Sequence, residues 1–361
     1  MNHIELFSGV GGFRMALDLL SNKGIANFQC IGYSEIDKNA KRTYFANFDI
    51  GDNEIDMGDV VAFIKDSNKM KELSQTKCHL LTGGFPCQTF SMMGKQEGFA
   101  DEGRGQMFFR ILDIIDVTNP NYLLLENVKN LVSHNKGKTY KIIEHELKNR
   151  GYFVYSNVYN SSDFGLPQIR NRVIIFATKT QLSFEEEKEF NPRGVKDFFW
   201  NSIKSLNVNT YNSTLDILVE DVQEKYFLSE KIKPTILADG SGNFKSKSEI
   251  NLKIARPLTA SMHKMHRACQ DNYYSQDFIT SKGQYNPALI YDKEELAKCK
   301  IRKLTPQEAF LLQGFPAYFA QQAQKVGVAD GALYKQAGNA VSVNTIYAIM
   351  YYLISKDIIK D

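Results

Sequence analysis

The sequence predicts an α/β fold, in which a parallel sheet covered by helices is joined to a smaller, mostly irregular or β domain. Three observations predict it. Across residues 3–178, short apolar runs of β-forming residues alternate with longer runs whose apolar residues recur at helical spacing. Across 181–300 the chain is rich in Asn, Ser and Lys and has few periodic segments, whereas 334–359 returns to helical periodicity. We therefore expect one domain over 1–180, a second over 181–300, and a final part over 301–361 that rejoins the first domain.

Expected strands alternate with longer helical segments along the first domain, and the last two strands follow one another directly. The strands share short runs of apolar or aromatic residues bounded by turn residues, and cover 3–7, 29–35, 79–83, 122–126, 153–159 and 172–178. The helices share apolar residues three and four positions apart, and cover 13–20, 38–45, 108–116 and 139–149. Parallel strands end at one edge of a sheet, so residues that follow different strands are expected to lie together.

Composition limits the class of protein. A chain of 361 residues with 43% hydrophobic content can bury one large core or two modest ones, which argues against a disordered protein. No apolar run is long enough to span a bilayer, and the first residues lack the pattern of a signal peptide, so we expect a soluble, cytoplasmic protein. Five scattered cysteines without a CxxC pair are expected to be free thiols, with no metal site. A net charge of +3 is compatible with nucleic-acid binding but does not establish it.

A glycine-rich loop after the first strand predicts a ligand site. Residues 7–12 read FSGVGG and open a helix, so that the backbone can approach a ligand; the alternative is a tight turn that binds nothing. Glu35 ends the second strand, where a carboxylate can accept hydrogen bonds from ribose hydroxyls, and Asp59 follows a possible third strand near an adenine amine. Both could instead be solvated loop residues. The loop is not GxGxxG, which favours S-adenosylmethionine over a pyrophosphate ligand.

Three further segments carry reactive side chains at expected strand ends. Cys87 follows Pro86 in a loop without an apolar wall, which favours exposure to a cleft over the usual burial of a free thiol. Glu126 ends an apolar strand, where it either makes a structural hydrogen bond or has a raised proton affinity suited to an acid. Arg170 and Arg172 occupy alternate positions and share one face of a strand, although they could simply pair with surface acids.

Taken in order, these segments resemble the cytosine-5 DNA methyltransferase family, especially the single-chain enzymes of bacterial restriction-modification systems. The segments that carry the resemblance are FSGVGG (7–12), GGFPCQTFS (83–91), ENV (126–128), QIRNRV (168–173), RPLT (256–259), LTPQE (304–308), QGFP (313–316) and QAGNAV (336–341). The resemblance implies a Rossmann-like S-adenosylmethionine-dependent methyltransferase domain, a smaller target-recognition domain and DNA in the cleft between them. One difference is DEGRGQ (101–106), which is one residue longer than the family's usual run.

The resemblance also implies a role for each residue. Cys87 would add to the 6-carbon of a flipped cytosine, Glu126 would contact the ring, and Arg172 with Arg170 would steady both base and carboxylate. The 5-carbon would then take the methyl group. The residues expected to bind S-adenosyl-L-methionine are Phe7, Ser8, Gly9, Gly11, Gly12, Glu35, Ile36, Asp59, Val60, Pro86, Asn339 and Val341.

The expected macromolecular partner is double-stranded DNA. A glycine-rich loop over 88–105 is expected to close on it, and the smaller domain to read its sequence. The expected contacts are Gln88, Ser91, Lys95, Arg104, Gly240, Gly242, Lys264 and Arg267, although a solvated basic face explains the cations equally well. A monomer is expected, with any companion restriction endonuclease acting separately.

Three alternatives compete with this interpretation. An RNA cytosine methyltransferase shares these motifs, but the Cys-Phe-Thr signature of the tRNA-modifying branch is absent. A nicotinamide oxidoreductase would explain the glycine loop and Glu35 but not Cys87 and Glu126. A catalytically inactive DNA-binding protein of the same fold would have no reason to keep Cys87, Glu126 and Arg172 together.

Overall fold

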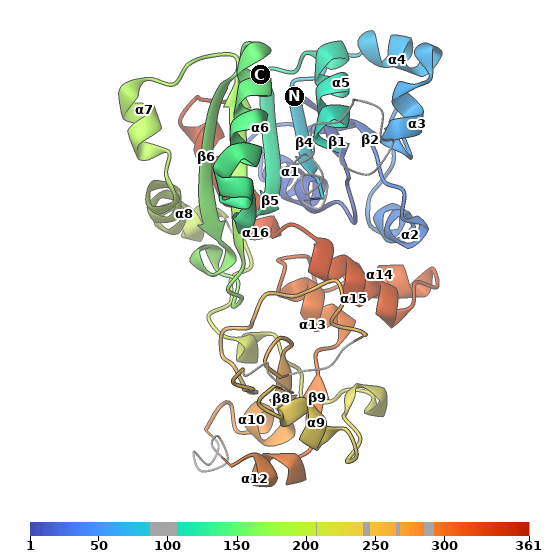
Figure 1. The fold of residues 1–361 in the computed structure, drawn as a ribbon, viewed down its shortest axis with the longest axis vertical. Helices are drawn as coiled ribbons and strands as arrows, with labels where there is room; N and C mark the ends of the chain where they lie inside the picture. Colours follow the sequence, from blue (N-terminus) through green and yellow to red (C-terminus); the bar gives the residue numbers. More distant parts are fainter. Residues whose placement is uncertain (87–106, 207, 241–245, 265–267, 285–291, 361) are drawn as a thin grey trace.

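Seven strands form the central sheet of the computed structural model, which describes residues 1–86, 107–206, 208–240, 246–264, 268–284 and 292–360 (Figure 1). The sheet order is β3-β2-β1-β4-β5-β7-β6. The strands are β1 (Asn2–Leu6), β2 (Gln29–Tyr33), β3 (Ile55–Asp56), β4 (Leu80–Gly84), β5 (Tyr122–Val128), β6 (Phe153–Asn160) and β7 (Asn171–Thr178). β1 to β5 are parallel, as the alternation of strands and helices predicts.

The last strand departs from the predicted parallel sheet. β7 runs antiparallel to both of its neighbours, β5 and β6. Only the short 3-10 helix η4 (Ser161–Phe164) and a few loop residues separate β6 from β7. A parallel crossover needs a dozen or more residues and usually a helix, so this short connection reverses the strand. As a result the first residues of β7, and not its last, lie at the edge where β5 ends.

Helices cover both faces of the sheet. On one face lie α1 (Gly12–Asn22), α8 (Pro192–Leu206) and α16 (Val343–Ser355), whose apolar residues share one core. On the other face lie α3 (Val60–Ile64), α4 (Ser67–Ser74), α5 (Met107–Thr118) and α6 (Lys138–Asn149). Leu124 of β5 points into the first core, whereas Leu123 and Leu125 point into the second, which explains why this strand is apolar at consecutive positions.

α1 shows how the sequence specifies one of these helices. Gly11 starts it with φ of +82°, and Phe13, Ala16, Leu17 and Leu20 are buried at helical spacing. A side chain at Gly11 would clash with the Phe48 ring, so this position needs glycine for space as well as for its backbone angle.

Four more helices are α2 (Lys38–Asn47), α7 (Phe184–Glu189), α14 (Phe319–Lys325) and α15 (Asp330–Asn339). α7 and α8 fall within 181–300, the range expected to form the smaller domain. α8 nevertheless packs on α16 and η4 of the larger body, because its buried face carries Val195, Phe199 and Leu206. α14 packs against α2.

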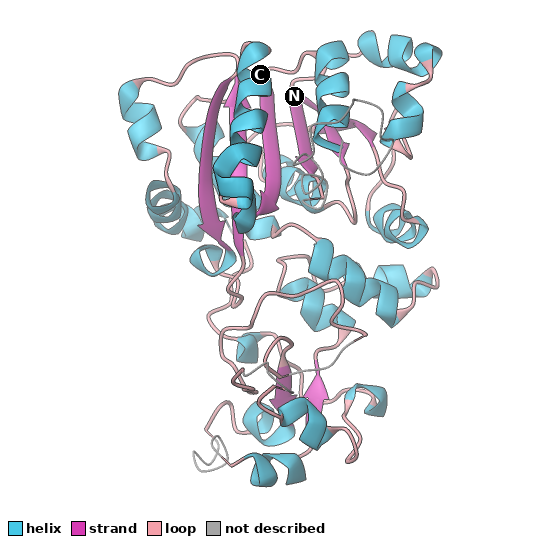
Figure 2. Ribbon diagram, in the orientation of Figure 1, coloured by secondary structure: helices cyan, strands magenta, loops and turns pink. Residues whose placement is uncertain are grey.

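The part of the chain from α9 to α13, here called the smaller body, consists of short helices and loops around a two-stranded antiparallel sheet (Figure 2). Its sheet pairs β8 (Tyr273–Ser275) with β9 (Ile301–Lys303). Around it lie α9 (Lys233–Leu237), α10 (Gln276–Thr280), α12 (Lys293–Lys298) and α13 (Pro306–Leu311). Arg302 of β9 is buried against Glu308 of α13 at 2.7 Å, an ion pair that joins the sheet to the start of α13. Among the described helices, none combines the length and the apolar character needed to cross a membrane.

Candidate active site

A cavity of about 340 Å³ lies at the carboxyl ends of β1, β2, β4 and β5. In doubly wound folds, ligands bind at this edge of the sheet. Its wall includes eleven of the residues expected from the sequence: Phe7, Ser8, Gly9, Gly12, Glu35, Pro86, Glu126, Arg170, Arg172, Asn339 and Val341. Residues far apart in the sequence therefore form one concave surface.

The loop after β1 forms one end of the cavity. Phe7 and Gly9 both have positive φ, and the Gly9 amide donates to Glu35 Oε2 at 2.8 Å. The Gly12 backbone lies so close to Val341 that a side chain at position 12 would overlap the valine. The buried Ser8 hydroxyl has no hydrogen-bond partner among the described residues. The loop is therefore shaped for a ligand that reaches the backbone and offers a polar group to Ser8.

The Glu35 carboxylate is fixed at the end of β2. It accepts hydrogen bonds from the Gly9 amide on one oxygen and from the Asp37 amide, at 2.7 Å, on the other. Asp37, which also lines the cavity, is paired with Lys335 at 2.6 Å. Burial raises the pKa of Asp37, but the Lys335 ammonium and the backbone amides that start α2 outweigh burial and hold that pKa below its usual value.

Four expected cofactor residues lie off the cavity wall. Gly11 starts α1, and Val60 is buried in α3. Ile36 is 71% exposed beside Glu35. The Asp59 carboxylate accepts from the Val61 amide at 2.9 Å, so in this structure it starts α3.

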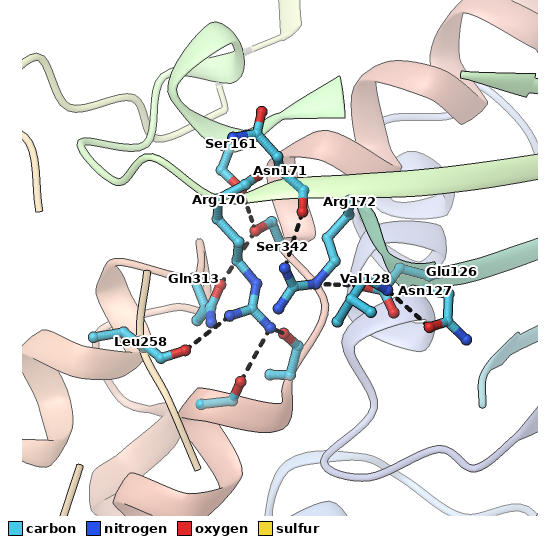
Figure 3. A network of polar contacts seen from close by, with 12 residues as sticks. Glu126, Asn127, Val128, Ser161, Arg170, Asn171, Arg172, Leu258, Gln313 and Ser342 are labelled. Carbon is cyan, nitrogen blue, oxygen red and sulfur yellow. Dashed lines mark hydrogen bonds and ion pairs between the residues drawn. The ribbon is translucent and has the colours of Figure 1, made fainter. Parts of the chain in front are cut away.

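Glu126 and Arg172 form an ion pair at the other end of the cavity, with 2.8 Å between Oε1 and Nε (Figure 3). Burial raises the pKa of the Glu126 carboxyl, against the opposite effects of Arg172 and then Arg170. β5 delivers Glu126 and the antiparallel β7 delivers Arg172, two positions along the ladder from it. The carboxyl group is therefore held in place and has an increased affinity for a proton.

Arg170 has different partners from Arg172. Its guanidinium is fully buried and donates to the carbonyl oxygens of Leu258 at 3.0 Å, Gly338 at 3.0 Å and Ala340 at 2.9 Å (Figure 3). Burial, and next the neighbouring charge of Arg172, lowers the pKa of Arg170 to about 9, against the effect of Glu126. Both arginines line the cavity, as expected for residues that share a face. The Arg170 guanidinium, however, donates its hydrogen bonds to backbone carbonyls and so fixes the chain on either side of Asn339.

Buried amides extend this connection. Gln168 accepts from the Leu258 amide at 2.8 Å and donates to the Leu312 carbonyl at 2.9 Å, and Gln313 donates to the Ala337 carbonyl at 2.6 Å. Sequence reasoning assigned no role to either glutamine, although each stands in a motif that carries the resemblance. Asp37 and Lys335 were also missed. A signal for Asp37 was its position two residues after Glu35, whereas nothing in the sequence pointed to Lys335.

The segment that follows β4 is described only as far as Pro86. The Phe85 carbonyl accepts from the Asn127 side chain at 2.8 Å, next to Glu126. Several expected site residues lie outside the described residues: Cys87, Gln88, Ser91, Lys95, Arg104, Gly242 and Arg267. Of the expected DNA contacts that the structure describes, Gly240 has φ of +83° and Lys264 is exposed.

The four described cysteines are weak candidates for a nucleophile. Cys30 and Cys78 are buried, which raises the pKa of both thiols, that of Cys78 to about 12. Cys269 and Cys299 are partly buried and do not line the cavity. Within the described ranges, no group of His, Cys, Asp or Glu side chains is arranged to hold a metal ion.

Comparison with known proteins defines the class of enzyme that has this fold and cavity. The family model for C-5 cytosine-specific DNA methylases matches residues 1–355, and the chain belongs to that family. It is a DNA (cytosine-5-)-methyltransferase, of a family that uses S-adenosylmethionine.

The relatives and structural neighbours of this chain include bacterial type II methyltransferases and eukaryotic methyltransferases. The chain is 34% identical to the type II methyltransferase M.SsoII of Shigella sonnei, over 98% of this chain and 79% of the relative. It is 32% identical to M.HaeII of Haemophilus aegyptius, over 98% and 92%. The fold is that of the Entamoeba histolytica methyltransferase EhMeth, with a TM-score of 0.72, 22% identity and coverage of 100% and 99%. Dnmt2 of S. pombe matches with a TM-score of 0.71, 18% identity and coverage of 99% and 98%.

Proposed function

We propose that this enzyme methylates a flipped cytosine in a specific sequence of double-stranded DNA, through a covalent bond between Cys87 and the cytosine ring. The observation that carries the proposal is the single cavity that contains both Glu35 and the Glu126–Arg172 ion pair. A base inside a stacked duplex cannot enter such a cavity, so the target nucleotide must leave the helix.

The cofactor is proposed to occupy the end of the cavity next to β1 and β2. S-adenosylmethionine supplies a methyl group on a positively charged sulfur. The Glu35 carboxylate, already oriented by two amides, would accept from the ribose hydroxyls, and the unpartnered Ser8 hydroxyl suits the amino-acid part. The exposed Ile36 would cover one face of the adenine. We propose that Phe7, Gly9, Gly12, Pro86, Asn339 and Val341 line the site, and that Gly11, Asp59 and Val60 support it from outside the wall.

The other end of the cavity is proposed to hold the cytosine. The Cys87 thiolate would bond to the 6-carbon, which pushes electrons into the ring and makes the 5-carbon nucleophilic. The Glu126 carboxyl, whose pKa is raised, would donate a hydrogen bond to ring N3 as negative charge develops there. After the methyl group joins the 5-carbon, loss of the 5-proton returns an electron pair to the ring and breaks the bond to Cys87.

The two arginines are proposed to act differently in this reaction. Arg172 would orient Glu126 and contact the base, since it faces both the carboxylate and the cavity. Arg170 would act as a positioning residue, because two of its three hydrogen bonds hold Gly338 and Ala340 on either side of Asn339. The two residues before Cys87 support its assignment to this cavity. Pro86 lines the cavity, and the Phe85 carbonyl accepts a hydrogen bond from Asn127, which is next to Glu126.

The rest of the chain is proposed to bind and read DNA. The contacts α8 makes with α16 favour a domain boundary after residue 206. The smaller body and the segment after Cys87 would supply the DNA contacts, namely Gln88, Ser91, Lys95, Arg104, Gly240, Gly242, Lys264 and Arg267. We propose that the enzyme acts as a monomer, and the type II relatives support a restriction endonuclease as a separate companion.

The experiment that tests the proposal traps the covalent bond. A duplex amplified with 5-fluorodeoxycytidine triphosphate in place of the normal nucleotide carries fluorine at every cytosine, so the target sequence need not be known. Attack and methyl transfer proceed, but fluorine cannot leave as a cation, and the enzyme should remain bonded to DNA on a denaturing gel only when cofactor is present.

Cysteine variants identify the bonded thiol. Cys87→Ala should form no adduct while it still binds cofactor in a calorimeter, and Cys269→Ala, the matched control, should form it as the parent does. An adduct that survives in Cys87→Ala would refute the mechanism. So would methyl transfer to ordinary DNA by that variant.

A further inference from the structure

Four lysines cluster in the segment that follows β5. Lys129, Lys136, Lys138 and Lys141, here named the lysine surface, are all exposed, and residues 129–143 contain no Asp or Glu. Among the residues that the structure describes, no carboxylate forms an ion pair with any of the four. The lysine surface is therefore an uncompensated concentration of positive charge.

The lysine surface begins at the mouth of the cavity. Val128, the last residue of β5, lines the cavity and is 37% exposed, and Lys129 is its neighbour in η2 (Lys129–Leu131). The chain continues through η3 (His134–Gly137) into α6, whose first residues lie at the end of the sheet that faces the smaller body (Figure 1). The lysine surface is therefore continuous in sequence with the cavity that the flipped nucleotide is proposed to enter.

Charge is segregated along α6. Lys138 and Lys141 stand at the amino end, whereas the acids Glu144 and Glu146 lie further along, where they pair with Lys148 at 2.6 Å and Arg150 at 2.9 Å. Cations at the amino end of a helix are disfavoured by its dipole. The arrangement does not serve the stability of α6, and it fits an external anion.

The preceding loop holds Lys136 in a defined position. Asn135, Lys136 and Gly137 all have left-handed backbone angles, with φ of +51°, +56° and +80°. A lysine rarely adopts that conformation. His134 Nδ1 lies 2.7 Å from the Thr139 hydroxyl, which ties the loop to α6.

We propose that the lysine surface binds phosphates of the DNA backbone beside the flipped nucleotide, independently of base sequence. The proposal rests on the proposed function, because a flipped base in the cavity fixes where the duplex runs. The spread of the four lysines over η2, η3 and the start of α6 suits contacts to several phosphates of one strand.

The test compares two double variants that remove the same charge. Lys136→Gln with Lys138→Gln changes the lysine surface. Lys71→Gln with Lys77→Gln removes two exposed lysines, one in α4 and one between α4 and β4. Lys77 lies near the start of β4, whereas the cavity lies where β4 ends. The probe is a fluorescein-labelled duplex of 30 base pairs of mixed sequence, titrated by anisotropy between 50 and 300 mM KCl.

Each lost phosphate contact should reduce the slope of log affinity against log salt by about 0.9, equivalent to about fivefold in affinity at 0.15 M salt. We expect a reduction near twice that slope for the first pair and none for the control pair. The first variant should also need more plasmid DNA for half-maximal methyl transfer, with an unchanged rate at saturation.

An unchanged slope in the first pair, or equal losses in both pairs, would overturn the proposal. Thermal unfolding of both variants, expected at the parent temperature, separates a lost contact from a damaged fold. Failure of the proposed function is distinguishable, because the parent enzyme would then form no adduct with fluorinated DNA whatever the salt slopes are.

Discussion

Replacing Arg170 by Met should destabilise the enzyme and weaken cofactor binding at the same time. The change removes three hydrogen bonds from a charged donor and leaves the buried carbonyls of Leu258, Gly338 and Ala340 without their partner. Each such bond contributes about 1.5–3 kcal/mol, opposed by the burial of the guanidinium that lowers its pKa to about 9. Each buried carbonyl left without a donor costs about 1–3 kcal/mol, and the lost burial cost of the guanidinium offsets part of this, so we expect the free energy of unfolding to fall by a few kcal/mol.

Urea unfolding measures this cost, and calorimetry with S-adenosylmethionine measures the second effect. Because Gly338 and Ala340 flank Asn339 on the cavity wall, the dissociation constant should rise in the folded variant. Arg172→Met is the comparison for the cofactor effect: it breaks the ion pair with Glu126, whose carboxyl can take up a proton instead, so methyl transfer should be lost while the affinity for S-adenosylmethionine stays near that of the parent. An Arg170→Met enzyme with the stability and cofactor affinity of the parent would refute the positioning role.

Two further predictions concern acids in the larger body. Glu35→Ala should weaken S-adenosylmethionine binding by about tenfold to a hundredfold, the value of a hydrogen bond to a charged group, and calorimetry that finds parental affinity would remove Glu35 from the site. Burial raises the pKa of Glu5 to about 8 from 4.5, against the Arg14 charge and the backbone amides of Arg14 and Phe13, and with a smaller contribution from Asp18. The folded chain therefore keeps a proton that the unfolded chain releases, so the stability contributed at acid pH is lost as pH rises from about 4.5 to 8. Glu5→Gln stays neutral, and its unfolding free energy in urea should fall less over that window, by a few kcal/mol; parallel curves for the two proteins would contradict this.

Many strands and helices around the central sheet could be predicted from the sequence, because local hydrophobic patterns determine them. The apolar run before Glu126 predicted a strand over 122–126, which lies within β5, and Leu123, Leu124 and Leu125 of β5 are buried in two cores. Periodicity predicted a helix over 13–20, which lies within α1. The composition of β7 did not predict its direction, because the short connection that precedes the strand decides it.

Part of the candidate site could also be predicted from the sequence, because several of its residues directly follow or end predicted strands. Glu35, Glu126 and Pro86 stand at strand ends, and the structure places all three on one cavity wall. The partners of Arg170 could not be predicted, because they are backbone carbonyls of segments 88 and more residues away. The pair between Asp37 and Lys335 joins residues 298 positions apart, a distance over which no local pattern carries information.

The contact between Gly12 and Val341 sets an order of events during synthesis. The first strand and its loop leave the ribosome early, yet the valine that closes the loop belongs to a segment made after most of the chain. Contacts of such long sequence separation form late and slow the folding of a domain. A nascent chain should therefore leave this loop open until the segment that contains Val341 has been made, so that the site around the loop is completed late in synthesis.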